Sequence, residues 1–303
     1  EGEAITECLR AETLGWVHLS ADHADARDWI FHHMPYLDET VPEALTAPST
    51  RSRASRIGKG ILAVLRGLNF NDGKDPEDMV AIRIWADAER IVTLSRQRVR
   101  ALEDIVGDIQ AGRGPAGTGE FVALLAERLN ARMEPLISDL DVETDALETL
   151  VVGSPDQDLR HRIVTMRLQV IELRRHAAPQ REALLRLEAE DIPFTDETDR
   201  RHLREAREKL TRLVENLDEM RDSLAVLREE LSGQLSDRLN RHMYILSILS
   251  AIFLPLGFLT GLLGINVGGM PGAQDPMAFW AVSGGLLVVV VVQIAVLRRA
   301  RWL

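Results

Sequence analysis

Hydrophobic residues follow two different patterns along this chain, and the change falls near residue 243. Before it, apolar and charged residues are interspersed, whereas from Tyr244 onward the only charged side chains are Asp275 and three arginines at the very end. Tyr244–Ile265 is an uncharged run of 22 residues, and Phe279–Leu297 is an uncharged run of 19. Since about 20 apolar helical residues cover the hydrocarbon core of a bilayer, we predict two transmembrane helices, over 244–265 and 279–297.

The segment between these runs, residues 266–278, contains three glycines and two prolines and cannot continue a helix. It carries no lysine or arginine, whereas Arg238 and Arg241 precede the first run and arginines follow the second. The positive-inside rule therefore predicts an extracytoplasmic loop over 266–278 and cytoplasmic termini, including a tail over 298–303.

A heptad pattern precedes the first span. Its nine apolar positions alternate steps of three and four residues: Leu203, Ala206, Leu210, Leu213, Leu217, Met220, Leu224, Leu227 and Leu231. Because no proline occurs between Pro193 and Pro255, we predict one helix from near Thr195 to near Gly264, about 100 Å long at 1.5 Å per residue. Residues 195–243 would form a cytoplasmic stalk that either transmits a conformational change to a gate or serves as a passive support.

The first part of the chain has strand-like alternation of apolar residues in Gly15–Ser20, Ser55–Phe70 and Met79–Leu94, with a helical stretch at Glu39–Thr46. After Phe121 the pattern is helical. One run, containing Leu159, Ile163, Met166, Val170 and Leu173, is predicted to end at Pro179, and Pro193 marks the next break. The fold class is therefore α+β with membrane helices, in which an N-terminal α/β and helical cytoplasmic domain occupies residues 1–194.

Charge and composition argue against some classes of function. The net charge of -11 argues against nucleic acid as a partner, because phosphate binding needs basic patches. It favours attraction of cations, although ordinary solubility explains it too. The single cysteine, Cys8, excludes an intrachain disulfide, and Gly112–Gly119 lacks the Gly-Lys-Ser or Gly-Lys-Thr of a nucleotide-binding loop.

One face of the first span is small and partly polar. By three-and-four spacing it comprises Met243, Ser247, Ser250, Leu254, Gly257, Gly261 and Gly264. Small residues at this spacing allow close helix packing, and they also suit a pore in which hydroxyls contact a hydrated ion while Met243 and Leu254 form apolar constrictions. Since two spans cannot enclose a conduit alone, the pore interpretation requires a homo-oligomer.

The chemistry of the spans restricts how an ion could pass. Neither run contains Asp, Glu, Cys or His, so a dehydrated Zn²⁺ held by nitrogen and sulfur ligands within the membrane is not expected. We predict that a divalent ion passes with much of its water, and that Asn266, in an oligomer, supplies a ring of carbonyl oxygens to its hydration shell. The absence of a carboxylate also leaves no obvious proton carrier in the spans.

These residues resemble a known family. Gly264-Ile265-Asn266 at the outer end of the penultimate span, followed by Val267-Gly268-Gly269-Met270-Pro271-Gly272, resembles the CorA superfamily of divalent cation transporters. Magnesium members generally carry Gly-Met-Asn at this place. The isoleucine, the Gly-Gly-x-Pro loop, Phe253 to Pro255, and the closing Arg301-Trp302-Leu303 look more like the ZntB-type zinc transporters.

The resemblance implies a homopentamer in the bacterial inner membrane, in contact with lipid, with a funnel-shaped cytoplasmic domain and the long helix lining the pore. It implies that Gly264, Ile265 and Asn266 form the outer selectivity ring. It also implies that the conduit is lined by Met243, Leu246, Ser250, Leu254 and Gly257. Magnesium members often have a threonine where Gly257 stands, so a hydroxyl ring is missing at that depth. The transported ion would be Zn²⁺, with Mg²⁺, Co²⁺, Ni²⁺ and Cd²⁺ as further candidates, and no resident cofactor is expected.

Other candidate metal ligands carry less weight. The adjacent His32 and His33 would point apart on a helix, and His242 stands at the cytosolic mouth. Two clusters could bind divalent ions between subunits or be solvated faces: Asp22, His23 and Asp25 in the first, and Asp139, Asp141, Glu143 and Asp145 in the second.

Three functional classes are thus in competition. Transport of hydrated Zn²⁺ is the main hypothesis, and an Mg²⁺ or Co²⁺ channel of the same architecture is its nearest rival. A membrane-anchored scaffold or signalling protein would use the heptads to bind a partner. An enzyme is the weakest hypothesis, because no nucleophile, base and orienting group can be assembled from spacing.

Overall fold

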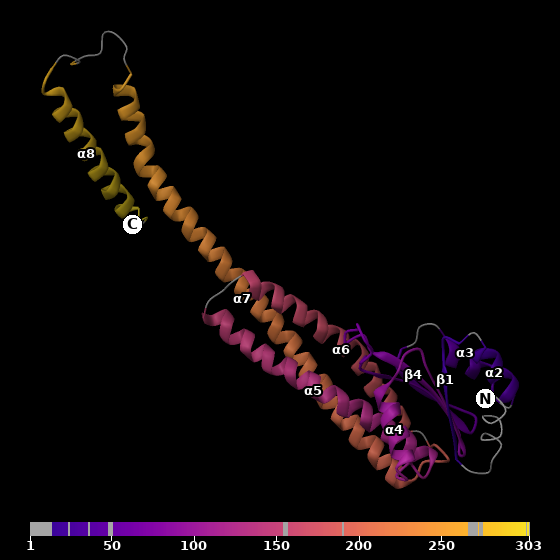
Figure 1. Ribbon diagram of the computed structural model, residues 1–303. Helices are drawn as coiled ribbons and strands as arrows, with labels where there is room; N and C mark the ends of the chain where they lie inside the picture. The colour runs from indigo at the N-terminus through magenta and orange to yellow at the C-terminus, as the bar shows by residue number, and fades with distance from the viewer. Residues whose placement is uncertain are drawn as a thin grey trace. The chain divides into compact units, whose positions relative to one another are not determined.

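The computed structural model describes residues 14–23, 25–35, 37–47, 51–153, 157–189, 191–265, 272, 275–300 and 302 (Figure 1). Asn266 and Cys8 lie outside these residues. The chain divides into two compact units, Glu1–Glu229 and Glu230–Leu303, and each is described by itself.

The first unit is built on a mixed five-stranded sheet. Its strands are β1 (Gly15–Ser20), β2 (Arg53–Ile57), β3 (Gly60–Gly67), β4 (Val80–Ala86) and β5 (Arg90–Ser95), in the order β1-β5-β4-β3-β2. Only the pair β1 and β5 is parallel, and the other neighbours are antiparallel. This sheet confirms the predicted α/β character, and two of the predicted strand segments prove to be hairpins.

Local chemistry explains the two hairpin turns. Gly58, between β2 and β3, has a φ of +61°, which a residue without Cβ adopts without strain. Between β4 and β5, Oδ1 of Asp87 accepts hydrogen bonds from the backbone N–H groups of Glu89 and Arg90 at 3.0 and 2.9 Å. Such a side-chain bond to the following backbone is how aspartate stabilises a turn.

Helices α2 (Ala26–His33) and α3 (Thr40–Thr46) supply one hydrophobic core against the sheet. Its buried side chains are Ile30, Met34, Val41, Leu45, Leu62, Trp85, Val92 and Leu94. Leu62, Trp85 and Val92 are paired across β3, β4 and β5, so they lie on the same face of the sheet.

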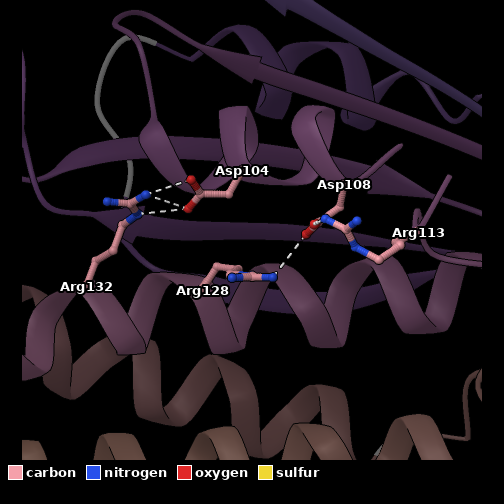
Figure 2. Close-up of polar contacts among 5 residues, drawn as sticks. All are labelled: Asp104, Asp108, Arg113, Arg128 and Arg132. Carbon is pink, nitrogen blue, oxygen red and sulfur yellow. Dashed lines mark hydrogen bonds and ion pairs between the residues drawn. The ribbon is translucent and has the colours of Figure 1, made fainter. Parts of the chain in front are cut away.

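On the other face of the sheet, α5 (Thr118–Gly153) contacts β3, α6 (Gln157–Ala189) contacts β2 and β3, and α4 (Arg100–Gln110) packs against α5. Ring centroids of Trp16 and Phe121 are 4.9 Å apart there. Helix α4 is joined to α5 by ion pairs. Arg132 binds both carboxylate oxygens of Asp104, at 2.6 to 3.0 Å, and Arg128 contacts Asp108 at 3.0 Å (Figure 2).

Helix α7 (Glu197–Leu263) begins and ends within two residues of the predicted limits and confirms the long helix. Its heptad positions are buried from Leu203 through Leu231. Polar contacts to the neighbouring helices support this packing: Nδ2 of Asn130 in α5 donates to the carbonyl of Ala206 at 2.7 Å, and Lys209 pairs with Glu134 at 2.6 Å.

The prediction that Pro179 ends a helix is wrong, because α6 continues through it to Ala189. Proline removes a helical hydrogen bond and disfavours the preceding turn. Burial of Ala177, Ala183 and Leu184 on both sides offsets this cost, and Oε1 of Gln180 accepts a hydrogen bond from the backbone N–H of Arg66 at 2.5 Å. Tertiary packing therefore overrides the local signal.

The second unit contains the end of α7 and helix α8 (Ala278–Arg299). Both α7 and α8 contain a stretch long and apolar enough to cross a membrane. These stretches match the two spans expected from the uncharged runs.

Candidate ion pathway

Most of the surface of α7 in the second unit is uncovered, including the face predicted to line a pore. The pore stripe, defined as Met243, Leu246, Ser247, Ser250, Leu254, Gly257 and Gly261, is exposed at every position. Leu254 is 72% exposed and Met243 is 67% exposed. A Cβ added at Gly257 or Gly261 would meet nothing within 4 Å, so the stripe borders open space in the single chain.

The opposite face of α7 is the more covered one. At 3.6 residues per turn, Ile248, Ile252, Leu256 and Leu259 lie across the helix from the stripe, and all four are only partly exposed. The small residues of the stripe are therefore not used for close packing of α8 against α7 within one chain. This leaves the stripe available to a neighbouring copy or to an ion.

Among the described residues, hydrogen bonds join both α8 and the residues after it to α7. Nε2 of Gln293 donates to the carbonyl of Ala251 at 3.5 Å, and the hydroxyl of Tyr244 donates to the carbonyl of Trp302. Oε1 of Gln293 is buried and has no hydrogen-bond partner in the part of the chain that the structure describes. Gln293 is not among the residues predicted from the sequence, although a lone amide beside a run of valines is a signal of a polar contact between membrane helices.

At the outer end of the stripe the helix stops. The backbone N–H of Gly264 donates to the carbonyls of Thr260 and Gly261 at 2.9 and 3.2 Å. A Cβ at Gly264 would lie 3.0 Å from the carbonyl oxygen of Thr260, so glycine suits this tight final turn. Ile265 is exposed, and Asn266, the central residue of the predicted selectivity ring, lies outside the described residues.

The histidine and acidic candidates in the first unit have other partners. Nδ1 of His32 and of His33 each bonds a carbonyl of α2, at 2.7 and 2.9 Å, and His33 stacks on Trp29. Asp22 pairs with Arg96 at 2.8 Å.

The run from Asp139 to Asp145 presents its acids on the solvent side of α5, where Glu143 contacts Arg162 at 3.4 Å. Among the described residues, no group of three histidine, cysteine or acidic side chains is placed to hold a metal ion. The uncovered stripe is therefore the strongest candidate site.

Comparison with known proteins places this arrangement in a family. Residues 11–299 match the family described as CorA-like Mg2+ transporter protein. This chain belongs to that family. The match covers both units, so the sheet domain, the long helix and the two apolar spans are family features.

Two relatives align over nearly the whole chain. The divalent cation transporter CmaX of Pseudomonas aeruginosa is 38% identical over 305 residues, covering 99% of this chain and 90% of the relative. The zinc transport protein ZntB of Yersinia enterocolitica is 36% identical over 299 residues, covering 97% and 89%.

The fold has a solved counterpart as well. The structure of the full-length CmaX protein superposes with a TM-score of 0.81 at 38% identity, over 95% of this chain and 88% of that one. With two membrane-length apolar helices and this family membership, the chain is a membrane protein.

Proposed function

We propose that this protein transports divalent metal ions, zinc above all, through a pore formed by α7 from several copies of the chain. The observation that carries the proposal is the pore stripe, a small and partly hydroxylated face that α8 leaves uncovered. Membership in a family of cation transporters and the 36% identity to a zinc transport protein support it.

The stripe suits an ion that keeps its water. The hydroxyls of Ser247 and Ser250 and the backbone beside Gly257 and Gly261 offer neutral oxygens, which bind a hydration shell weakly enough for the ion to move on. Met243 and Leu254 bracket the serines with apolar rings that would close the path by excluding water. Gly264, Ile265 and Asn266 would form the entrance on the extracytoplasmic side.

The orientation of the protein follows from charge. Arginines precede the first span and follow the second, whereas the loop over 266–278 carries none. Both termini therefore lie on the cytoplasmic side of a bacterial inner membrane. The copies form a closed ring around the stripe, and a pentamer is the arrangement we propose.

Flux measurements test the proposal. Proteoliposomes holding the full chain and a metal-sensitive dye are given Zn²⁺, Mg²⁺, Co²⁺, Ni²⁺ or Cd²⁺, with and without a pH gradient. We expect Zn²⁺ to enter fastest. Strong Mg²⁺ flux without Zn²⁺ flux would assign the protein to magnesium, and no flux of any ion would favour the scaffold hypothesis.

Two substitutions test which residues line the ion pathway. Asn266→Ala should abolish Zn²⁺ flux, and Ser250→Leu should lower it by about tenfold or more, because a bulky apolar side chain dewets the pore. Ile252→Leu, on the opposite face of α7, serves as the matched control and should transport normally. Equal loss in the Ser250 and Ile252 variants would contradict the assignment of the pore face, and size-exclusion profiles would show whether each variant still assembles.

A further inference from the structure

Three arginines converge on one face of the sheet, beyond the part that α2 and α3 cover. Arg66 of β3 is paired with Ala81 of β4, and Arg96 follows Ser95, which is paired with Ile82. Ala81 is thus flanked by two arginines. Because side chains two residues apart share a face, Arg83 lies on this face as well. The small side chain of Ala81 leaves a hollow between the three guanidinium groups.

This hollow is a polar pocket of about 280 Å³. Arg66, Arg83, Arg96 and Lys74 line it, and Asp78 is the acidic side chain in its wall. The lining therefore holds four positively charged side chains and one carboxylate, in a chain whose net charge is -11, and outside the lining Glu172 interacts electrostatically with Arg66. The acid nearest to Arg96, Asp22, is already engaged by that arginine at 2.8 Å.

Arg83 gives the pocket a buried and incompletely satisfied cation. Its side chain is 2% exposed, and its Nη2 donates to the carbonyl of Ala47 at 2.7 Å. Its Nε and Nη1 are buried and find no hydrogen-bond partner within the described part of the chain. Burial, with Arg96 and Arg66 nearby, lowers the pKa of Arg83, and Asp22 opposes this. A buried charge without a counter-charge is costly, so a ligand that supplies one is stabilised here.

The hydrogen-bond donors in the pocket favour an oxyanion as the ligand. Guanidinium N–H groups form a planar fork that matches the oxygens of phosphate, and such charge-assisted hydrogen bonds are among the strongest in proteins. Arg66 is held in place by donation from its Nη1 to the carbonyl of Met79 at 2.7 Å. The volume lies just below the range of about 300 to 1,000 Å³ typical of pockets for drug-sized ligands, which favours a small anion over a whole nucleotide.

We propose that this pocket is a binding site for a small tetrahedral oxyanion of the phosphate class, held by the free N–H groups of Arg83 together with Arg66 and Arg96. The site belongs to the first unit and the pore stripe to the second, and the proposal rests on no step of metal transport. Its occupant neutralises the excess positive charge of the pocket and so stabilises the first unit.

Calorimetry and thermal melting of the full chain in detergent, free of added metal, test the site. We expect inorganic phosphate to bind and to raise the melting temperature relative to chloride at equal ionic strength, since a ligand that binds only the folded state stabilises it. ADP is run in parallel. Binding of ADP without binding of inorganic phosphate would overturn the small-anion assignment, and the absence of both would overturn the site.

Variants locate the binding. Arg96→Gln and Arg83→Met should each weaken phosphate binding by about tenfold or more, because each removes a charged donor. Arg98→Gln is the matched control, since Arg98 points to Glu103 at 2.6 Å and does not line this pocket. If Arg83→Met fails to fold, Arg96→Gln decides the matter. Unchanged phosphate affinity in Arg96→Gln would contradict the proposed site.

Discussion

At the scale of single residues, Gly119 shows how one missing side chain lets two helices meet. It stands in the first turn of α5, where an added Cβ would lie 2.0 Å from Oδ2 of Asp199 and 2.9 Å from the carbonyl oxygen of Phe194. Asp199 cannot simply move away. It shares a reciprocal cap with Asp196 at the start of α7, with hydrogen bonds of 2.7 and 3.2 Å.

We therefore expect Gly119→Ala to lower the free energy of unfolding by about 1 to 3 kcal/mol, through overpacking and loss of the cap. Urea denaturation followed by circular dichroism measures it. The control is Gly107→Ala in α4, where a Cβ meets nothing within 4 Å and the change should be neutral or stabilising. Equal stability of the Gly119 variant and the parent would contradict this prediction, because it would show that the α5–α7 junction rearranges to accept the added methyl group without cost.

At the scale of elements, ion pairs between arginine and carboxylate side chains join α6 to α7, and each helix contributes both arginines and carboxylates. Arg174 of α6 binds Asp218 of α7 through two nitrogens, and Glu188 of α6 accepts hydrogen bonds from Arg204 and Arg207 at 2.8 and 2.6 Å. The hydrogen bond from Arg174 lowers the pKa of Asp218. Burial raises the pKa of Glu188, but its two arginines more than offset this, and the net pKa is lowered.

These shifts fix the sign of a pH dependence. Because both folded-state pKa values lie below the unfolded ones, of about 3.9 for Asp and 4.3 for Glu, the stabilisation is complete above those values and is lost as the pH falls through the folded-state pKa values. We expect the free energy of unfolding to decline below about pH 4, and the double variant Asp218→Asn with Glu188→Gln to decline less steeply.

The control for this experiment is Asp222→Asn, since Asp222 is exposed and pairs only with the adjacent Arg221 among the described residues. Denaturant midpoints recorded across the acid range compare the three proteins. Identical acid profiles for the parent and the double variant would show that the α6–α7 pairs are not the source of the dependence.

At the scale of the whole molecule, the single chain is an incomplete transporter. Helices α7 and α8 leave the pore stripe uncovered, and two spans cannot surround a conduit. Assembly of several copies with the stripe facing a common axis would bury these small and apolar residues and create the path at the same time.

Cross-linking tests this arrangement. Cys8 is the one cysteine of the chain, so a Cys8→Ser background permits single cysteines to be placed at will. With a short bismaleimide in membranes, Ser250→Cys should give covalent dimers, since each chain offers one thiol, whereas Ile252→Cys, across the helix, should stay largely monomeric. Equal cross-linking at both positions would contradict a stripe that faces the axis.

Features that depend on neighbouring residues could be predicted from the amino-acid sequence alone. Uncharged runs of about 20 residues identified both membrane-length helices, and apolar residues at steps of three and four identified α7 and its stripe. Both signals can be recognised from residues close together in the sequence. The residues of the selectivity motif were likewise found by sequence, and their role remains a prediction.

Contacts between segments far apart in the sequence became known from the three-dimensional fold. It paired β1 with β5, carried α6 through Pro179, and showed that α8 leaves the stripe uncovered. It also brought Arg66, Arg83 and Arg96 around Ala81, from strands whose pairing no local pattern specifies. The physical reason is that strand order and helix docking are set by the burial of surfaces far apart in the chain, and such contacts leave no period in the sequence.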